Sequence, residues 1–149
     1  MYSTKLSVSI HILCMLALNN GNPITSDWIA GSIGTNPALV RRLMGKLKKA
    51  DLIQVQTKIG ATGLNKPSEE ISLYEVFRAV EDQQRIFDLH TNTNENCFVG
   101  ANIGRSLTGV YDKLQETFEK QLDEVRLSEI INHLQEECGD ENISGSYTK

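Results

Sequence analysis

The chain has 149 residues, 40% of them hydrophobic, and a formal net charge of −4 at pH 7. Length and composition fit one globular domain, or a small domain with an extension, that can bury a real core. No apolar run approaches the roughly 18 residues of a membrane span, and three scattered cysteines, Cys14, Cys97 and Cys138, exclude a disulfide framework. Without a recognisable secretory signal, we expect a cytoplasmic protein.

Charge is distributed unevenly along the chain. Residues 1–66 carry eight Lys and Arg against two Asp, a balance of +6, whereas residues 67–149 carry seven Lys and Arg against seventeen acids, a balance of −10. A basic block followed by an acidic one indicates two functional parts rather than a uniform enzyme surface. The negative total therefore does not exclude a nucleic acid partner, because a local basic face can bind phosphates.

Two helices are predicted before residue 34. Residues 4–20 form a largely buried first helix, because apolar residues recur at helical spacing: Leu6, Ile10, Leu13 and Ala17. Turn formers at residues 20–23 end it. A short second helix follows over residues 27–33, capped by Thr25 or Ser26, with Trp28 and Ile29 as its core candidates.

A third helix begins after a glycine-containing turn at residues 34–35. Asn36 is a good N-cap, and Pro37 suits the first helical position, where no amide hydrogen is needed. One side of this helix is apolar and should face the core: Val40, Leu43, Leu47 and Ala50. Two helices joined by a tight turn are the helix-turn-helix arrangement.

The opposite side of the third helix is basic and has small residues between its cations: Ala38, Arg41, Arg42, Gly45, Lys46 and Lys49. A face of this kind can approach a DNA groove closely, so we interpret it as the recognition face. Asn36 belongs to the same candidate DNA-binding set. In isolation, the same pattern is also typical of an ordinary solvated helix face.

A β-hairpin is predicted next, with strand-forming residues at 52–57, a turn at 58–63 and a short return strand at 64–66. Lys58 and Lys66 flank the turn, where a wing beside a recognition helix could touch phosphates. A plain surface hairpin is the alternative. Ser72 and Glu75 then form a capping box for a helix over residues 72–81.

These segments together resemble the bacterial winged-helix regulators of the Rrf type, which include iron–sulphur and nitric-oxide sensors. The resemblance lies in the first helix with Lys5, the run LVRRLMGKLKKADLI, the hairpin GATGLNKP and the helix ISLYEVFRAVE, and it extends over nearly the whole chain. The wing of the family usually reads Gly-Gly-Tyr-x-Leu before a basic residue, whereas residues 60–64 here read GATGL. The resemblance implies a mainly α fold with a winged helix-turn-helix and a long dimerisation helix. Lys5 joins the candidate phosphate contacts.

The polar, aperiodic residues 88–100 predict a loop. Cluster-binding relatives place three closely spaced cysteines here, but this chain has only Cys97, so we expect no iron–sulphur cluster and no other cofactor. His90 and Cys97 could contribute two ligands to a metal site, although two residues at this spacing are weak support and a solvated loop histidine is the simpler interpretation.

An apolar stripe then continues for more than twenty residues: Ile103, Leu107, Val110, Leu114, Phe118, Leu122 and Val125. A helix of this length, roughly 30 Å, is longer than a small winged-helix domain is wide, so part of the stripe needs another partner. A second copy of the chain is the natural candidate, as the resemblance also implies. Packing entirely within one subunit is the alternative.

We therefore predict a winged helix-turn-helix over residues 1–81, a connector at 82–100, dimerisation helices at 101–135 and a flexible polar tail at 136–149. The expected function is a homodimeric DNA-binding transcriptional regulator, most simply a repressor. Catalytic motifs are lacking: there is no phosphate loop, metal-ligand pair or nucleophile elbow. The alternative is an adaptor that acts through a partner protein or a small ligand.

The inducing signal is not specified by any motif. Cys97, in an exposed loop between the two halves, is a candidate thiol sensor, and Cys138 in the acidic tail is its candidate resolving thiol. Neighbouring acids would raise thiol pKa values and oppose this role, so two incidental cysteines are an equally good interpretation. These acids are Glu95, Glu136, Glu137 and Asp140. Cys14 is expected to be buried and inert.

Overall fold

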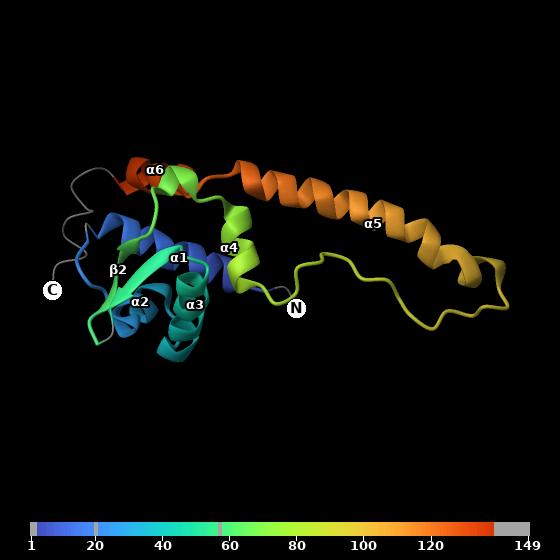
Figure 1. Ribbon diagram of the computed structural model, residues 1–149, viewed down its shortest axis with the longest axis horizontal. Coiled ribbons are helices and arrows are strands. Elements are labelled where there is room, and N and C mark those ends of the chain that lie inside the picture. The colour runs from blue at the N-terminus through green and yellow to red at the C-terminus, as the bar shows by residue number, and fades with distance from the viewer. Residues whose placement is uncertain (1–2, 20, 57, 139–149) are drawn as a thin grey trace.

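The computed structural model describes residues 3–19, 21–56 and 58–138. Helices dominate, and one antiparallel hairpin supplies the only sheet formed by these residues. A compact body holds most elements, and one long helix extends from it as an arm (Figure 1). In chain order the elements are α1 (Lys5–Leu18), α2 (Ser26–Ile33), α3 (Pro37–Lys49), β1 (Ile53–Gln56), β2 (Gly60–Leu64), the 3-10 helix η1 (Ser68–Glu70), α4 (Leu73–Val80), α5 (Phe98–Glu124) and α6 (Leu127–Cys138).

The core forms around α1, which contacts α2, α3, α4, α6 and β2. Ile12 and Leu13 of α1 are fully buried, and so are Ile29, Leu43 and Leu47 from the two helices that follow. Because α1 has neighbours on several sides, its sequence is apolar almost throughout rather than on one stripe. The predicted buried first helix is confirmed.

Two of the predicted core positions are wrong. Trp28 lies on the outer side of α2 and is 39% exposed, so Ile29 and Ala30 carry the packing of that helix. Ala50 is also exposed, because α3 ends at Lys49 and the chain turns away there. The fourth buried residue of α3 is instead Met44, one residue after Leu43.

The hairpin differs from its predicted strand limits. The return strand runs over Gly60–Leu64 rather than 64–66, with Ile53 opposite Leu64 and Val55 opposite Ala61. The connection before α2 binds this strand, since Ile24 and Ala61 exchange backbone hydrogen bonds of 2.9 and 3.0 Å. Gly60 has a φ of 114°, and a Cβ there would collide with the carbonyl oxygen of Ile24. This close approach requires glycine, and it allows β2 to pair with Ile24 as well as with β1.

Helix α4 has half of its predicted capping box. The Ser72 hydroxyl oxygen accepts the Glu75 amide hydrogen at 3.1 Å, as expected for an N-cap. The Glu75 carboxylate does not return to the Ser72 amide. It accepts from Lys66 at 2.8 Å instead, which ties the base of the hairpin to α4.

The arm consists of α5 and the connector at residues 82–97, which runs back along it (Figure 1). Helix α5 begins at Phe98, three residues earlier than the predicted connector allowed. Gln115 is the buried residue that holds the two together: its side-chain amide donates to the Gln84 carbonyl at 2.7 Å and accepts from the Ile86 amide at 3.0 Å. Arg85 and Asp112 add an ion pair at 2.9 Å.

Helix α6 returns to the body. Leu127 and Ile131 are buried in the same core as α1, although the sequence placed them in a segment of dimerisation helices at 101–135. Backbone hydrogen bonds join the two sides, from the Leu73 amide to Val125 at 2.9 Å and from the Leu127 amide to Ile71 at 2.8 Å. The body of residues 1–81 is thus completed by α6.

Residues 136–138, which the sequence placed in the tail, belong to α6 instead, and Cys138 is the last residue of this helix. The rest of the predicted polar tail, residues 139–149, lies outside the described residues. Among the helices that the structure describes, none combines the length and hydropathy that crossing a lipid bilayer requires.

Candidate nucleic-acid interface

Helix α3 is held in place by caps and by its buried side. The Asn36 side-chain oxygen accepts the Leu39 amide hydrogen at 2.8 Å, and Pro37 occupies the first turn. Gly34, in the left-handed region at φ 78°, ends α2 and turns the chain into α3. The two helices pack against each other, so this pair forms the predicted helix-turn-helix.

The outward side of α3 and the hairpin form a cationic strip. Its five cations are exposed, and none is in an ion pair within the described part of the chain: Arg41, Arg42, Lys48, Lys49 and Lys58. Lys58 occupies the hairpin turn with a φ of 72°. Ala38 and Gly45 on the same side are also exposed and add little bulk. We refer to these five cations as the basic strip.

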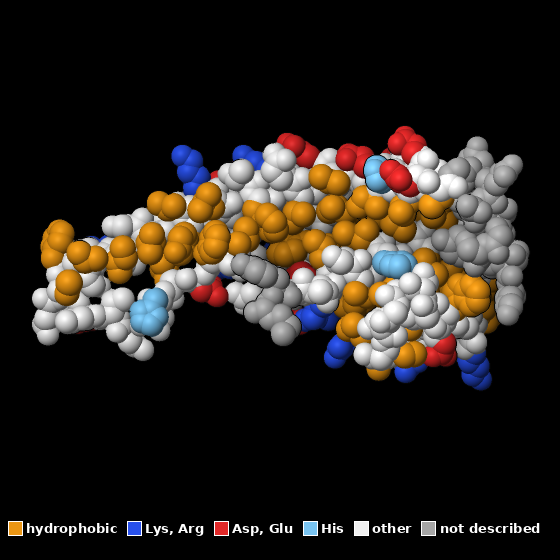
Figure 2. All heavy atoms as spheres, turned by 180° about the vertical axis from the view of Figure 1, so that it is seen from behind, with side chains coloured by type: hydrophobic (Ala, Val, Ile, Leu, Met, Phe, Trp, Pro, Cys, Tyr) orange, Lys and Arg blue, Asp and Glu red, His pale blue; other side chains and the backbone are white. Residues whose placement is uncertain are grey.

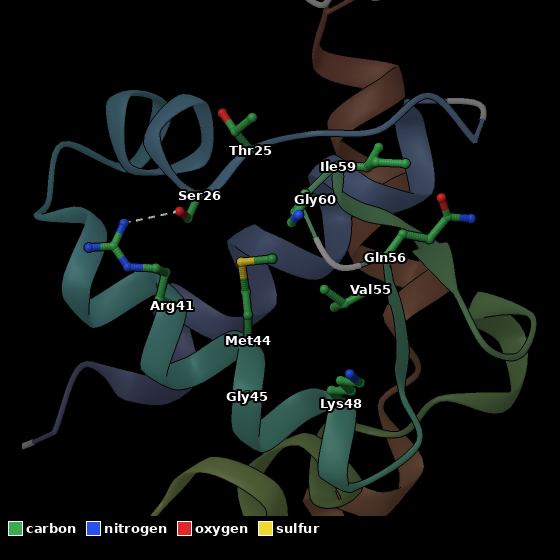
Figure 3. A pocket seen from close by; sticks show the side chains of 11 residues that line it. Thr25, Ser26, Arg41, Met44, Gly45, Lys48, Val55, Gln56, Ile59 and Gly60 are labelled. Carbon is green, nitrogen blue, oxygen red and sulfur yellow. Dashed lines mark hydrogen bonds between the residues drawn. The ribbon is translucent and has the colours of Figure 1, made fainter.

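A groove separates α3 from the hairpin (Figure 3). Its volume is about 500 Å³. Met44 of α3 and Val55 of β1 face it from either side, and Ile59 lies at its hairpin edge. At one edge of the groove, the Arg41 guanidinium group donates a hydrogen bond of 3.4 Å to the Ser26 hydroxyl oxygen (Figure 3).

Three of the predicted phosphate-binding lysines are held in intramolecular ion pairs. Lys66 pairs with Glu75, as described above, while Lys5 and Lys46 both contact the carboxylate of Asp82. The Lys46 ammonium group lies 2.7 Å from Asp82 and 3.3 Å from the Val80 carbonyl oxygen. Lys46 therefore faces α4 and the start of the connector rather than the open side of α3.

Asp82 is the acid that organises this cluster. Hydrogen bonds from Lys46 and Lys5 lower the pKa of its carboxyl to about 2, which keeps it ionised throughout the neutral and mildly acidic range. Because Asp82 is the first residue of the connector, this carboxylate joins α1, α3 and the root of the arm. Its exposure means that water and salt screen the attraction.

Two residues of the site were not predicted from the sequence. Lys48 was counted only in the overall charge, yet it follows Arg41 by seven residues and thus lies above it on the same side of α3. That spacing could have revealed it. Asp82 offered no such signal, because its partners lie 77 and 36 residues away in the chain. Asn36, placed with the DNA-binding residues, uses its side chain as the helix cap.

The predicted dimerisation stripe divides into two parts. Its last part packs on the body: Phe118 meets Phe77 edge-on at 5.7 Å between ring centres, Leu122 is half-buried, and Val125 lies just beyond the helix end. Nearer the tip, Ile103 and Leu107 are half-buried, whereas Val110 and Leu114 are 52% and 47% exposed. Hydrophobic side chains form a band along the arm (Figure 2).

Additional hydrophobic side chains are exposed along the arm, from the connector beside the middle of α5 to the arm tip. Phe98 is 85% exposed, and the other members are also exposed: Ile86, Phe87, Leu89 and Val99. Phe87 rests on Tyr111 of α5, with ring centres 5.4 Å apart. An apolar surface of this extent on an extended arm is typical of an interaction site.

The fold and the basic strip define a winged helix-turn-helix DNA-binding protein. The chain belongs to the Rrf2 family, described as iron-dependent transcriptional regulators, whose family model matches residues 2–133. This is a family of regulators rather than of enzymes. It is the family that the sequence resemblance indicated.

Similar proteins cover almost the full length of the described fold. The chain is 37% identical over 134 residues to YwnA of Bacillus subtilis (strain 168), a protein described as an HTH-type transcriptional regulator, covering 90% of this chain and 99% of YwnA. A crystal structure of a protein described as DNA-binding is 31% identical, with a TM-score of 0.70 and coverage of 85% and 98%. The structure of CymR, the global cysteine regulator of B. subtilis, shares the fold at 16% identity, with a TM-score of 0.66 and coverage of 89% and 96%.

The side chains of the described residues do not fit the iron site that the family description implies. Cys14 is buried, whereas Cys97 and Cys138 are exposed, and within residues 3–138 with their two gaps no three His, Cys, Asp or Glu side chains gather closely enough to hold a metal ion. Thiolate ligation of a cluster needs several neighbouring donors. His90 and Cys97 therefore gain no third ligand in the described part of the chain.

The three thiols differ in chemistry. Burial raises the pKa of Cys14 to about 11, so it stays protonated and unreactive. Cys97 is the N-cap of α5, and the nearby backbone amides of Gly100 and Val99 lower its pKa. The net shift of the Cys97 pKa is therefore opposite to the increase predicted from the neighbouring acids. A lowered pKa and full exposure favour the reactive thiolate form at Cys97.

Releasing the lysines of the Asp82 cluster should strengthen DNA binding. We expect Asp82→Asn to raise the affinity for a random-sequence 30-base-pair duplex about fivefold, because two cations become available to phosphates. The slope of log K against log salt concentration should become steeper by about one to two. Fluorescence anisotropy at several salt concentrations measures both. Asp88→Asn is the matched control, since Asp88 accepts from Gln83 and from no lysine of the described chain. Equal salt dependence in the two variants would contradict the prediction.

Proposed function

We propose that the protein is a homodimeric repressor that binds a specific DNA operator through α3 and the hairpin, and that oxidation of Cys97 controls this binding. The basic strip is the observation that carries the proposal. It places five exposed cations on the outward side of a capped helix and on the adjoining hairpin, without acid partners in the described residues. Repression would follow from an occupied operator that overlaps a promoter.

Within the strip, the two arginines are the proposed base readers. A guanidinium group can donate two parallel hydrogen bonds to guanine in the major groove, worth about 1 to 3 kcal/mol of discrimination. Arg41 and Arg42 are adjacent, so they point in different directions from α3 and cover two positions. Lys48, Lys49 and Lys58 are the proposed phosphate contacts, where a flexible point charge suffices.

Dimerisation through α5 is the second part of the proposal. The helix has 27 residues and is therefore about 40 Å long. Burying the exposed positions Val110, Leu114 and Phe98 against a second copy would remove a large apolar surface from water. A twofold axis relating the arms would also present two α3 helices to two half-sites of a palindromic operator.

Thiol control is the third part. The length of α5 separates Cys97 from the start of α6 by about 40 Å, and α6 lies on the body, away from the arm tip (Figure 1). The two cysteines of one subunit are then much farther apart than the roughly 7 Å that a disulfide allows. Any disulfide between Cys97 and Cys138 must therefore join two subunits, and it would form only after an oxidant removes two electrons and two protons from the pair.

Selection of genomic fragments by the purified protein, with and without oxidant, tests the whole proposal. Enrichment of a shared palindromic sequence that oxidant diminishes is the expected result. If no fragment is bound under either condition, the protein does not act as a DNA-binding regulator, and an adaptor that acts through a partner protein becomes the better explanation.

Arg42→Ala should weaken binding to the selected fragment about tenfold to hundredfold, because it removes the proposed bidentate contact to guanine. The same change should reduce the preference for that fragment over random duplex. Anisotropy titrations with both duplexes measure the two quantities, with Arg105→Ala on α5 as a control that removes an equal charge away from α3. Unchanged affinity and selectivity in Arg42→Ala would show that α3 does not read DNA in this way.

Leu114→Asp should convert the dimer to a monomer, because it places a charge in the centre of the proposed apolar interface. Sedimentation velocity on the parent and the variant gives the masses. Thr108→Asp introduces the same charge at an exposed position on the other side of α5 and should leave the dimer intact. A monomeric parent, or equal dissociation of both variants, would refute an interface on this stripe.

Cys97→Ser should abolish the response to oxidant. Diamide should crosslink the parent into a covalent dimer on a non-reducing gel and release it from the operator, whereas Cys97→Ser should do neither. Cys138→Ser identifies the second thiol, since it should lose the crosslink while Cys14→Ser keeps it. If Cys97→Ser responds to diamide as the parent does, a ligand or partner rather than this thiol carries the signal.

A further inference from the structure

The groove between α3 and the hairpin combines an apolar floor with a cationic edge. Met44, Val55 and Ile59 supply the hydrophobic lining, and Gly45 and Gly60 leave it unobstructed. Arg41, Lys48 and Lys58 supply three positive charges. No Asp or Glu lines the groove among the described residues.

We propose that this groove binds a small organic anion, namely a molecule with an aromatic or branched apolar body and one carboxylate or sulfonate group. The apolar body lies against Met44, Val55 and Ile59. The acid group lies at the cationic edge, where Lys48 and Arg41 come from α3 and Lys58 from the hairpin. Such a ligand would compete with DNA for the same face of the protein.

Charge and hydrophobicity together select this ligand class. A phosphate or sulfate ion satisfies the cations but leaves the apolar floor in water, so it gains nothing from Met44 or Val55. A neutral hydrocarbon covers the floor but makes no use of three nearby positive charges. Only a ligand that carries both features gains from both, and pockets with a mainly apolar lining and a few polar groups are typical small-molecule sites.

The size of the groove suits one small ligand. Its volume of about 500 Å³ lies within the 300–1,000 Å³ range of ligand pockets. Its walls are also held independently of any ligand. The capped α3 supplies one wall, and the other is fixed by the hydrogen-bonded pairing of β2 with Ile24. A groove that already exists requires little ordering on binding, which favours affinity.

Competition with DNA is the functional consequence, and this part rests on the proposed function. Lys48 and Lys58 are proposed phosphate contacts, so an anion paired with them neutralises charges that DNA would otherwise use. The apolar body would also occupy the space between the recognition helix and the wing. Regulation of this kind needs no change in the fold, because ligand and DNA exclude each other directly.

The probe for the test is 2-naphthoate, which has a bicyclic apolar body and one carboxylate. Titration followed by amide chemical shifts of the isotope-labelled protein should give saturable shifts at Met44, Val55 and Ile59, with a Kd on the order of 1 mM or below. Two reference compounds separate the contributions: 2-naphthylmethanol keeps the rings without the charge, and sodium sulfate supplies an anion without the rings. Both should bind more weakly than 2-naphthoate.

Matched variants locate the site. Lys48→Gln should raise the Kd for 2-naphthoate about threefold to fivefold, as expected for loss of one exposed ion pair. Lys49→Gln removes an equal charge from the next residue of α3, which does not line the groove, and should leave the Kd unchanged. Ile59→Gln changes an exposed side chain, so the fold survives, and it should weaken 2-naphthoate while leaving sulfate binding unaffected.

The outcomes separate this proposal from the proposed function. Saturable shifts at the groove, weakened by Lys48→Gln and not by Lys49→Gln, support the ligand site whether or not the protein binds DNA. An apparent Kd for DNA that rises linearly with 2-naphthoate supports competition. Absence of groove shifts in a protein that binds its operator overturns the ligand site alone. Equal binding of 2-naphthylmethanol, or equal effects of the two lysine variants, overturns the proposed anion recognition.

Discussion

The burial of Leu127 and Ile131 against α1 is the interaction on which the overall shape depends. Residues 71–73 pair with residues 125–127 through backbone hydrogen bonds, so the chain that leaves the body after α4 must return to it at the start of α6. The residues between these two segments must therefore leave the body and return to it. Phe77 against Phe118 fixes the root of this excursion, and Gln115 holds its outward and returning parts together. The arm is therefore a consequence of closing the core with the C-terminal helix.

The distribution of acids decides which cations remain available. The chain is negative overall, yet the acids that form ion pairs with cations of the DNA-binding unit lie on its flanks, at Glu75 and Asp82. They engage Lys5, Lys46 and Lys66, which are structural cations in this conformation. The cations of the basic strip on α3 and the hairpin turn form no ion pair with the described acids. The positive potential is thus concentrated on one side, where it is focused by the groove between α3 and the wing.

The helices could be predicted because their signals are local. Three helices begin with an N-cap side chain that accepts the backbone amide hydrogen three residues later: Thr25, Asn36 and Ser72. These contacts depend only on nearby sequence. The strand limits could not be predicted in the same way. GATGL has poor strand propensity, and it becomes a strand because Ile24 pairs with Ala61 and because Gly60 permits that approach. Tertiary pairing overrides local preference there.

Most basic residues of the candidate site could be predicted from the sequence, but the acids that pair with its lysines could not. The basic face of α3 follows from helical periodicity, and Lys48 could have been included by the same rule. The ion pair of Lys46 could not be predicted in this way, since its partner Asp82 is distant in sequence and lies in a segment without periodicity. Gln115 is comparable: a polar residue on a largely polar helix becomes buried only because the connector folds over it. Long-range polar contacts leave no periodic trace in a single sequence.

The placement of Asp82 also links the arm to α3. It begins the connector and binds Lys46 in the last turn of α3, so a displacement of the connector must either carry that lysine with it or exchange the ion pair for water. Exchange costs little, because both groups are partly or largely exposed and such pairs contribute at most about 1 kcal/mol. The freed lysine would then be available to phosphate, so release of the ion pair would strengthen DNA binding. By linkage, bound DNA would favour release by the same free energy. Coupling between the arm and α3 through this pair is therefore weak and reversible, which suits a regulator that must leave its site.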